Sequence, residues 1–419
     1  MFCIQDPSYE NSMFLHESLL AECLDAISGA GAYAFATKDG VNLLLADENF
    51  KTFMESGTYT LVVGTDDITN EHAINALIEL KKKYGSHLKV KAYVHNAKGS
   101  TFHPKFSWFK KADGGVLVLG SGNLTQKGLR HNREAYNVVC YDDQGISDIM
   151  AEWDRWYSHS EPFLFDIEDP IVMAKAKQNT EKIRAVSSAK ASVARTPKSE
   201  SGEIKLSDIY KNQPKNQSVV KKKPESITPT GEEDTKPEDS VPVVITDEDV
   251  DIDAAYWTIT LDTSVLIAEI PNNNKRWSQA NFSKGTFENY FGATCGENGT
   301  YRILLKHVNS DGSMCKTEAR PSVSVASRNY RFELDAAKGL AYPTGRERPI
   351  GIFAKVSCRD FVYTLLMPGQ PAYDDVMSFL AKSQAPSRLM RRISYTARDV
   401  FDAVPALPIW TRLEKDDNE

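Results

Sequence analysis

The chain has 419 residues and a net charge of −7, with 41% hydrophobic and 26% charged residues, which is ordinary for a soluble globular protein. No apolar run approaches the roughly 18 residues that a membrane-spanning helix needs, and the N-terminus lacks the pattern of a secretion signal. The six cysteines have no regular spacing, which favours reduced thiols over disulfides or a zinc site. We therefore expect a cytoplasmic protein with no membrane partner.

Apolar, strand-like runs alternate with helix-like segments through residues 1–170. The strand-like runs are 32–35, 59–63, 88–94, 115–119 and 135–141. The clearest helix covers 72–84, where apolar residues recur every three to four positions and lysines occupy the last turn, which the helix dipole favours. This alternation predicts an α/β domain built on a mostly parallel sheet flanked by helices.

Residues 171–253 have a different composition, rich in lysine, serine, proline and glutamate and poor in large apolar residues. The net charge is +9 over 171–223 and −10 over 224–253. Such a stretch cannot bury enough apolar surface to offset the entropy lost on ordering, so it predicts a flexible, solvated linker. The charge segregation leaves open that the basic half contacts phosphate and the acidic half shields a basic groove.

Residues 254–413 predict a second, β-rich domain. Strand-like runs at 257–270, 301–308, 330–334 and 350–366 combine β-branched and aromatic residues between turn residues, and 377–382 predicts a short helix. From residue 254 onward the net charge is +3, whereas residues 1–170 carry −9.

Residues suited to phosphodiester chemistry gather between positions 103 and 134. His103 and Lys105 lie two residues apart, so they face the same side if the segment is extended. A neutral imidazole is a nucleophile available at neutral pH, and a lysine ammonium stabilises charge on phosphate oxygens. The small Gly120-Ser121-Gly122-Asn123 segment follows a predicted strand, and Asn123 adds an amide donor. Glu134 can accept the second N–H of a histidine and fix its orientation.

The pattern His103-x-Lys105, then Gly120-Ser121-Gly122-Asn123, then Glu134 resembles the phospholipase D superfamily. The spacing is most similar to the metal-independent restriction endonucleases of the BfiI and NgoAVII type. These place a C-terminal pseudobarrel, related to the plant B-three DNA-binding domain, after the nuclease domain. The resemblance implies that His103 attacks phosphorus, that Lys105 and Asn123 hold the phosphate, and that Glu134 orients a histidine. It implies no metal and no cofactor.

The sequence departs from the superfamily pattern in two respects. Many members have an aspartate shortly after the lysine, whereas residues 106–109 contain none, so Glu134 is expected to take that role. The histidine-x-lysine motif also occurs only once in the chain. The competing structural interpretation is a strand-end histidine with a solvated lysine, and for Glu134 a salt bridge with Arg130 or Arg133. Ser121 is expected to shape the loop only.

Two segments of the second domain are candidates for reading DNA. Residues 272–290 interleave basic, amide and aromatic side chains, and residues 342–348 form an arginine-bearing turn. Arginine is the commonest reader of guanine, and asparagine or glutamine of adenine. The B-three resemblance implies two arms that grip the groove from opposite sides. The candidate DNA-binding residues are Lys275, Arg276, Gln279, Asn281, Lys284, Arg346 and Arg348.

These features predict a site-specific DNA endonuclease, of the kind found in restriction–modification systems, whose partner is double-stranded DNA. In-line displacement needs both a nucleophile and an acid, and a single motif supplies one histidine. The sequence therefore predicts a homodimer whose active centre is shared by two catalytic domains. Two alternatives stay open: a phospholipase D-type lipid phosphodiesterase and a non-catalytic DNA-binding regulator. The sequence also leaves open the need for an ATP-driven partner subunit.

Overall fold

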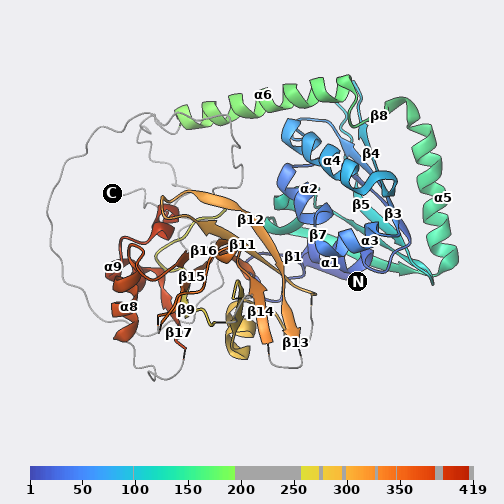
Figure 1. Cartoon of the computed structure of the whole chain (residues 1–419). Helices are drawn as coiled ribbons and strands as arrows, with labels where there is room; N and C mark the ends of the chain where they lie inside the picture. The colour runs from blue at the N-terminus through green and yellow to red at the C-terminus, as the bar shows by residue number, and fades with distance from the viewer. Residues whose placement is uncertain are drawn as a thin grey trace, which may run out of the picture.

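The computed structural model describes residues 1–97, 99–193, 256–272, 277–294, 299–325, 329–345, 347–382 and 390–414. Figure 1 shows two parts side by side, an N-terminal α/β part and a C-terminal β-rich part. Within the described residues, no helix is both long enough and apolar enough to cross a membrane.

The described N-terminal part contains an eight-stranded sheet in the order β1-β7-β6-β5-β2-β3-β4-β8. Its strands are β1 (Phe2–Gln5), β2 (Ser28–Tyr33), β3 (Thr58–Gly64), β4 (Leu88–Tyr93), β5 (Lys105–Lys110), β6 (Gly115–Gly120), β7 (Glu134–Tyr141) and β8 (Leu164–Asp166). Only the β2–β3 and β3–β4 pairs are parallel. The prediction of a mostly parallel sheet is therefore wrong. The four residues 111–114 that join β5 to β6 are too few for a parallel crossover, and β7 also pairs antiparallel with β6 after a connection of 13 residues.

Helices cover both faces of this sheet (Figure 1). They are α1 (Leu15–Cys23), α2 (Lys38–Leu45), α3 (Glu48–Met54), α4 (Glu71–Tyr84), α5 (Asp143–His159) and α6 (Pro170–Val193), with short turns η1 (Gly85–His87), η2 (Lys127–His131) and η3 (Glu161–Phe163). Side chains of α1 to α4 share one apolar cluster with the sheet, whereas α5 packs Ile146 and Trp153 on the opposite face, against Ala30, Ala32 and Trp108. Alternating side chains of a strand point to opposite faces, so β2 contributes side chains to the apolar clusters on both faces of the sheet.

The expected helix at 72–84 is confirmed as α4. The side chain of Asn70 caps its first turn by accepting a hydrogen bond from the Ala73 amide, and Gly85 ends it with a positive φ of 59°.

The predicted linker begins too early. Residues 170–193 form α6, which packs on α4 and buries Val172 and Ala176, so this helix belongs to the first domain. Its buried side combines Val172 and Ala176 with the polar Asn179 and Thr180, whereas Ile171 and Val186 are exposed, so the average composition did not reveal a docked helix. The remainder of the predicted linker, 194–253, lies outside the described residues.

The described C-terminal part is β-rich, with strands in a six-stranded sheet, β12-β11-β16-β15-β9-β17, and a three-stranded sheet, β10-β14-β13. The strands are β9 (Ser264–Glu269), β10 (Gln279–Phe282), β11 (Arg302–Val308), β12 (Met314–Pro321), β13 (Val323–Val325), β14 (Asn329–Glu333), β15 (Ile350–Lys355), β16 (Asp360–Leu366) and β17 (Arg392–Thr396). The helical elements are α8 (Tyr373–Ala381), α9 (Ala397–Ala403), η5 (Thr286–Tyr290), η6 (Asp335–Ala337) and η7 (Pro408–Arg412). An aromatic core lies between the two sheets. The pseudobarrel stays a prediction.

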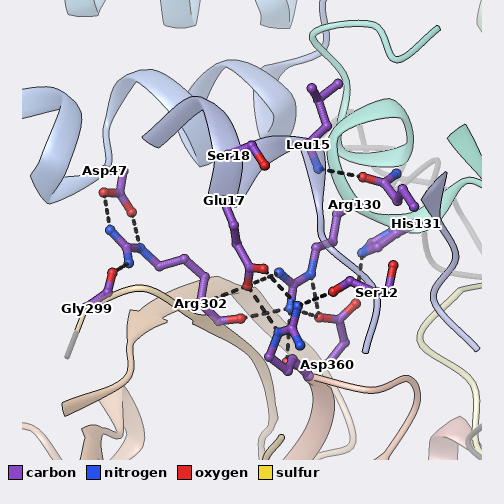
Figure 2. A network of polar contacts seen from close by, with 12 residues as sticks. Ser12, Leu15, Glu17, Ser18, Asp47, Arg130, His131, Gly299, Arg302 and Asp360 are labelled. Carbon is purple, nitrogen blue, oxygen red and sulfur yellow. Dashed lines mark hydrogen bonds and ion pairs between the residues drawn. The ribbon is translucent and has the colours of Figure 1, made fainter. Parts of the chain in front are cut away.

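A buried network of charged side chains joins the two parts (Figure 2). Arg130 of the first part has no exposed surface and lies 2.8 Å from Asp360 of β16 and 2.9 Å from Glu17 of α1. Arg359 binds the other oxygen of Glu17 at 2.8 Å. Arg302 of β11 makes two 2.8 Å bonds to Asp47, the residue that caps α3.

These charges are stable in burial only because each is paired. Burial opposes ionisation of Glu17, yet Arg359 and Arg130 hold its pKa at about 2. Two histidines, His16 and His131, lie beside the network. Burial is the main cause that lowers the pKa of each ring to about 3, and the nearby positive charge of Arg130 lowers it further. Both rings are therefore neutral at neutral pH. The two parts form one docked unit through contacts that neither could satisfy alone.

Candidate active site

The C-terminal ends of β2 and β6 and the N-terminal ends of β5 and β7 lie along the same edge of the first-domain sheet, the edge formed by strand ends. The register pairs Tyr33 at the end of β2 with Lys105 at the start of β5, and Gly120 at the end of β6 with Tyr136 near the start of β7. Strands β5 and β6 are antiparallel neighbours between them. The antiparallel order thus brings the segments around His103, Asn123 and Glu134 to the same edge, although 31 positions separate the first from the last.

His103 and Lys105 lie side by side, as their spacing predicted. The imidazole is exposed, and the Lys105 ammonium lies 2.8 Å from His103 Nδ1 and 3.1 Å from Nε2, and donates to the His103 carbonyl at 3.0 Å. An ammonium can only donate, and both ring nitrogens lie within hydrogen-bond distance of it, so the tautomer of the ring decides which nitrogen accepts. The pair therefore places an imidazole directly beside a cation.

Burial lowers the pKa of Lys105, whose side chain starts a strand and is largely covered, while the negative charge of Glu134 opposes this shift. The ammonium consequently lacks a full hydration shell and is available to an anion that enters the site. Glu134 lies close enough to contribute to the charge balance around it.

Phe35, which follows β2, connects the histidine to the asparagine loop. Its ring meets His103 edge to face, with centroids 6.1 Å apart, and its backbone N–H donates to Asn123 Oδ1 at 3.3 Å. Since the Asn123 oxygen accepts this bond, the amide NH₂ is the end left to face a phosphate.

Close packing against neighbouring residues of the chain requires glycine at positions 120 and 122 of the Gly120–Asn123 loop. A Cβ at Gly120 would come within 2.4 Å of the Tyr136 Cβ, and one at Gly122 within 2.6 Å of both the Gly128 carbonyl and Leu15. The small residues therefore allow the loop to pack against β7 and η2, which fixes the position of Asn123. The expected close approach to an anion is a separate matter and stays a prediction.

Glu134 is held by the same loop. One carboxylate oxygen accepts a short bond from the Ser121 hydroxyl, and the other accepts from Asn132 Nδ2 at 3.0 Å. Its expected alternative partners are engaged elsewhere: Arg130 in the interdomain network and Arg133 with Asp6 at 3.1 Å. Ser121 thus positions the carboxylate as well as shaping the loop. No bond from Glu134 to a histidine is recorded among the described residues, so that role stays a prediction.

Nothing in the sequence predicted how firmly this edge is attached to the second domain. Arg130 lies in η2, between Asn123 and Glu134, and its guanidinium also donates to the carbonyl of Arg302 at 2.8 Å. The loop that carries both candidate site residues is therefore anchored to a β-rich domain that begins more than 120 positions later in the chain.

The candidate DNA-reading residues are only partly described, because Lys275, Arg276 and Arg346 lie outside the described residues. Gln279 bonds Glu333 at 3.4 Å and Asn281 accepts from the Tyr330 amide at 3.1 Å, both from β10. The exposed Lys284 lies 3.9 Å from Glu288, and the 40% exposed Arg348 lies 3.2 Å from Glu269.

The two candidate segments touch. Trp277, within 272–290, and Tyr342, at the start of 342–348, meet edge to face with centroids 5.5 Å apart. Trp277 Nε1 also donates to the Leu340 carbonyl at 2.9 Å. The two segments are thus packed against each other at this point, which no sequence pattern indicated.

Comparison with known proteins gives limited matches. The chain matches no protein-family model and no curated protein. Among solved structures, NucT from Helicobacter pylori is 18% identical, with a TM-score of 0.26 over 36% of this chain and 88% of that one. Nuc from Salmonella typhimurium, described as a phospholipase D family member, is 14% identical, with a TM-score of 0.28 over 40% and 95%. The N-terminal domain of Helicobacter pylori LlaJI.R1 is 13% identical, with a TM-score of 0.23 over 32% and 97%. Likeness at this level does not establish the family.

Proposed function

We propose that this protein is a metal-independent, site-specific DNA endonuclease of the phospholipase D type. The observation that carries the proposal is the contact between an exposed imidazole and a partly buried ammonium, His103 and Lys105 at 2.8 Å. Asn123 and Glu134 lie on the same sheet edge and are held by Phe35 and Ser121. This set supplies a nucleophile, a cation and an amide donor for one phosphodiester, together with a carboxylate.

The proposed reaction has two steps. A nitrogen of His103 attacks phosphorus, a P–N bond forms, and the bond from phosphorus to the leaving oxygen breaks as an acid protonates that oxygen. Water then attacks the phosphohistidine, the P–N bond breaks, and the group that served as acid takes up the proton from water. Lys105 and Asn123 contact the non-bridging oxygens, where negative charge builds up.

The acid is assigned to the His103 of a second copy of the chain. Each chain contributes one histidine-x-lysine motif, and the exposed position of His103 at the sheet edge leaves it accessible to a partner. A two-fold axis through the phosphate would set the two imidazoles on opposite sides of it. Glu134 would then orient one of these rings by accepting its N–H, a bond that requires the dimer.

The β-rich domain is assigned the recognition of double-stranded DNA. Gln279, Asn281, Lys284 and Arg348 and the residues outside the description, Lys275, Arg276 and Arg346, are the proposed readers. The domain carries a net positive charge although the whole chain is acidic, which favours this assignment. We place the protein in the cytoplasm as a restriction enzyme.

Plasmid cleavage in excess EDTA tests the chemistry, with a labelled phospholipid as the competing substrate. We expect cleavage of DNA without added metal, no lipid hydrolysis, and loss of cleavage in His103→Ala with DNA binding retained in a gel-shift assay. Cleavage that EDTA abolishes and Mg²⁺ restores would refute the mechanism. So would an active His103→Ala variant.

Mixed dimers test the shared centre. Wild-type and His103→Ala subunits carrying different affinity tags are combined, and the heterodimer is isolated. We expect it to be almost inactive, because each cleavage uses both histidines. Half of the wild-type rate would show that each subunit works alone.

A further inference from the structure

A large cavity lies directly beside His103, on the α5 side of the sheet. Its volume is about 700 Å³, and its wall includes His103 itself and residues of β4, the segment before β5, and α5. The aromatic residues of the wall are Tyr93, Phe102, Phe106, Trp108, Trp153, Trp156 and Phe163. A ligand with a phosphate at His103 would therefore place its neighbouring group at or in this cavity.

The shape of the wall favours a flat ligand. Tyr93 and Phe102 are stacked with centroids 4.2 Å apart and an interplanar angle of 12°, and Trp156 lies nearly parallel to Phe102 at 20°. Phe163 continues this stack with an interplanar angle of 25° to Tyr93 and is 41% exposed. The inner rings of this stack cover one another, so the end rings Phe163 and Trp156 are the ones on which another flat ring can stack.

We infer that this aromatic cavity receives one unstacked nucleobase adjacent to the phosphodiester at His103. The inference rests on the proposed function, because it places the scissile phosphate at His103. A lipid acyl chain is a poorer fit, since flat rings dominate the wall and aliphatic side chains such as Leu117 and Ile149 are fewer. The substrate class is thus a DNA strand that is locally unpaired, or becomes so, next to the cut.

The test measures affinity and not only cleavage. A fluorescein-labelled single-stranded hexanucleotide and the same backbone with every base replaced by an abasic residue are titrated into the full chain carrying His103→Gln, which prevents cleavage. We expect the base-bearing strand to bind roughly ten- to a hundredfold more tightly by fluorescence anisotropy. Adding Trp156→Ala should remove most of this difference, whereas Trp156→Phe, which keeps a flat ring, should retain it.

Tyr9→Ala is the matched control, because Tyr9 is a 55% exposed aromatic residue outside the cavity, and it should leave the difference unchanged. Equal binding of the two strands would overturn the inference even if wild-type protein cleaves plasmid DNA, so the proposed function would survive. Binding of short-chain phosphatidylcholine in place of the hexanucleotide would overturn both. A dimer that dissociates on Trp156→Ala, measured by sedimentation, would identify the cavity as a subunit contact and also overturn the inference.

Discussion

Replacing Asp360 with asparagine tests whether the interdomain ions hold the two parts together. Asp360 has no exposed surface. It accepts hydrogen bonds from Arg130 Nε at 2.9 Å and from the Tyr256 hydroxyl at 2.7 Å, and it forms an ion pair with Arg130 Nη2 at 2.8 Å. Asparagine has nearly the same shape but no charge. The change would leave the buried Arg130 with Glu17 as its only remaining carboxylate partner among the contacts described above.

The expected loss in free energy of unfolding is about 3–5 kcal/mol, the usual cost of removing one partner of a buried ion pair. Burial and charge affect this free energy in opposite directions. Burial opposes ionisation of the Asp360 carboxyl, yet its pKa stays below its usual value because the charge of Arg130 and the Tyr256 hydrogen bond stabilise the anion. A loss of this size is a large part of the roughly 5–15 kcal/mol that stabilises a typical domain.

Urea unfolding followed by tryptophan fluorescence and circular dichroism measures the change. The matched control is Glu152→Gln, which breaks the exposed ion pair between Arg155 and Glu152, whose side chains are 69% and 72% exposed. That change should cost no more than about 1 kcal/mol. A loss below about 1 kcal/mol for Asp360→Asn would refute the claim that the network stabilises the docked pair.

Three further predictions follow from the site and its surroundings. His16 and His131 are neutral in the fold with pKa values of about 3, whereas unfolded histidines titrate near 6.5, so the unfolded chain takes up protons between these values and the folded chain does not. The free energy of unfolding should thus fall as the pH drops below about 6.5, by up to about 1.4 kcal/mol per unit for each histidine; urea midpoints at pH 7 and pH 5 check this, and equal stability would contradict it. Lys105→Met should lower the cleavage rate about a hundredfold or more, with Lys105→Arg less affected, in single-turnover assays; an active Lys105→Met variant would remove the lysine from the site. Arg346→Ala should weaken discrimination at about one base pair by ~1–3 kcal/mol in competition binding, and an unchanged specificity profile would exclude it as a reader.

The parts of the site that the sequence predicted depend on local geometry. Two residues at a spacing of two on an extended segment must share a side, and His103 and Lys105 do. Helix α4 was predictable for the same reason, because its apolar spacing and its final lysines are local signals.

The parts that the sequence did not predict depend on long-range pairing. Alternating strands and helices suggested parallel neighbours, but pairing partners are set by the whole sheet, and β5 to β7 run antiparallel. Arg130 looked like a surface arginine near Glu134, and nothing local shows that its partners are Glu17 and Asp360. Local patterns do not specify which distant carboxylate meets which arginine.

The interdomain ions restrict how this protein can diversify. A domain joined to its neighbour only by a flexible linker can be exchanged for another during evolution, because no specific interdomain contact has to be rebuilt. Here a foreign β-rich domain would have to supply counterparts for Glu17, Asp47 and Arg130 in the same positions, or leave them buried and unpaired. Inheritance of the two halves should therefore be linked, and related chains should change Arg130 and Asp360 together or not at all. New DNA-binding preferences would then arise by gradual substitution in loops far from the interdomain ion network. The two domains would evolve as a single unit.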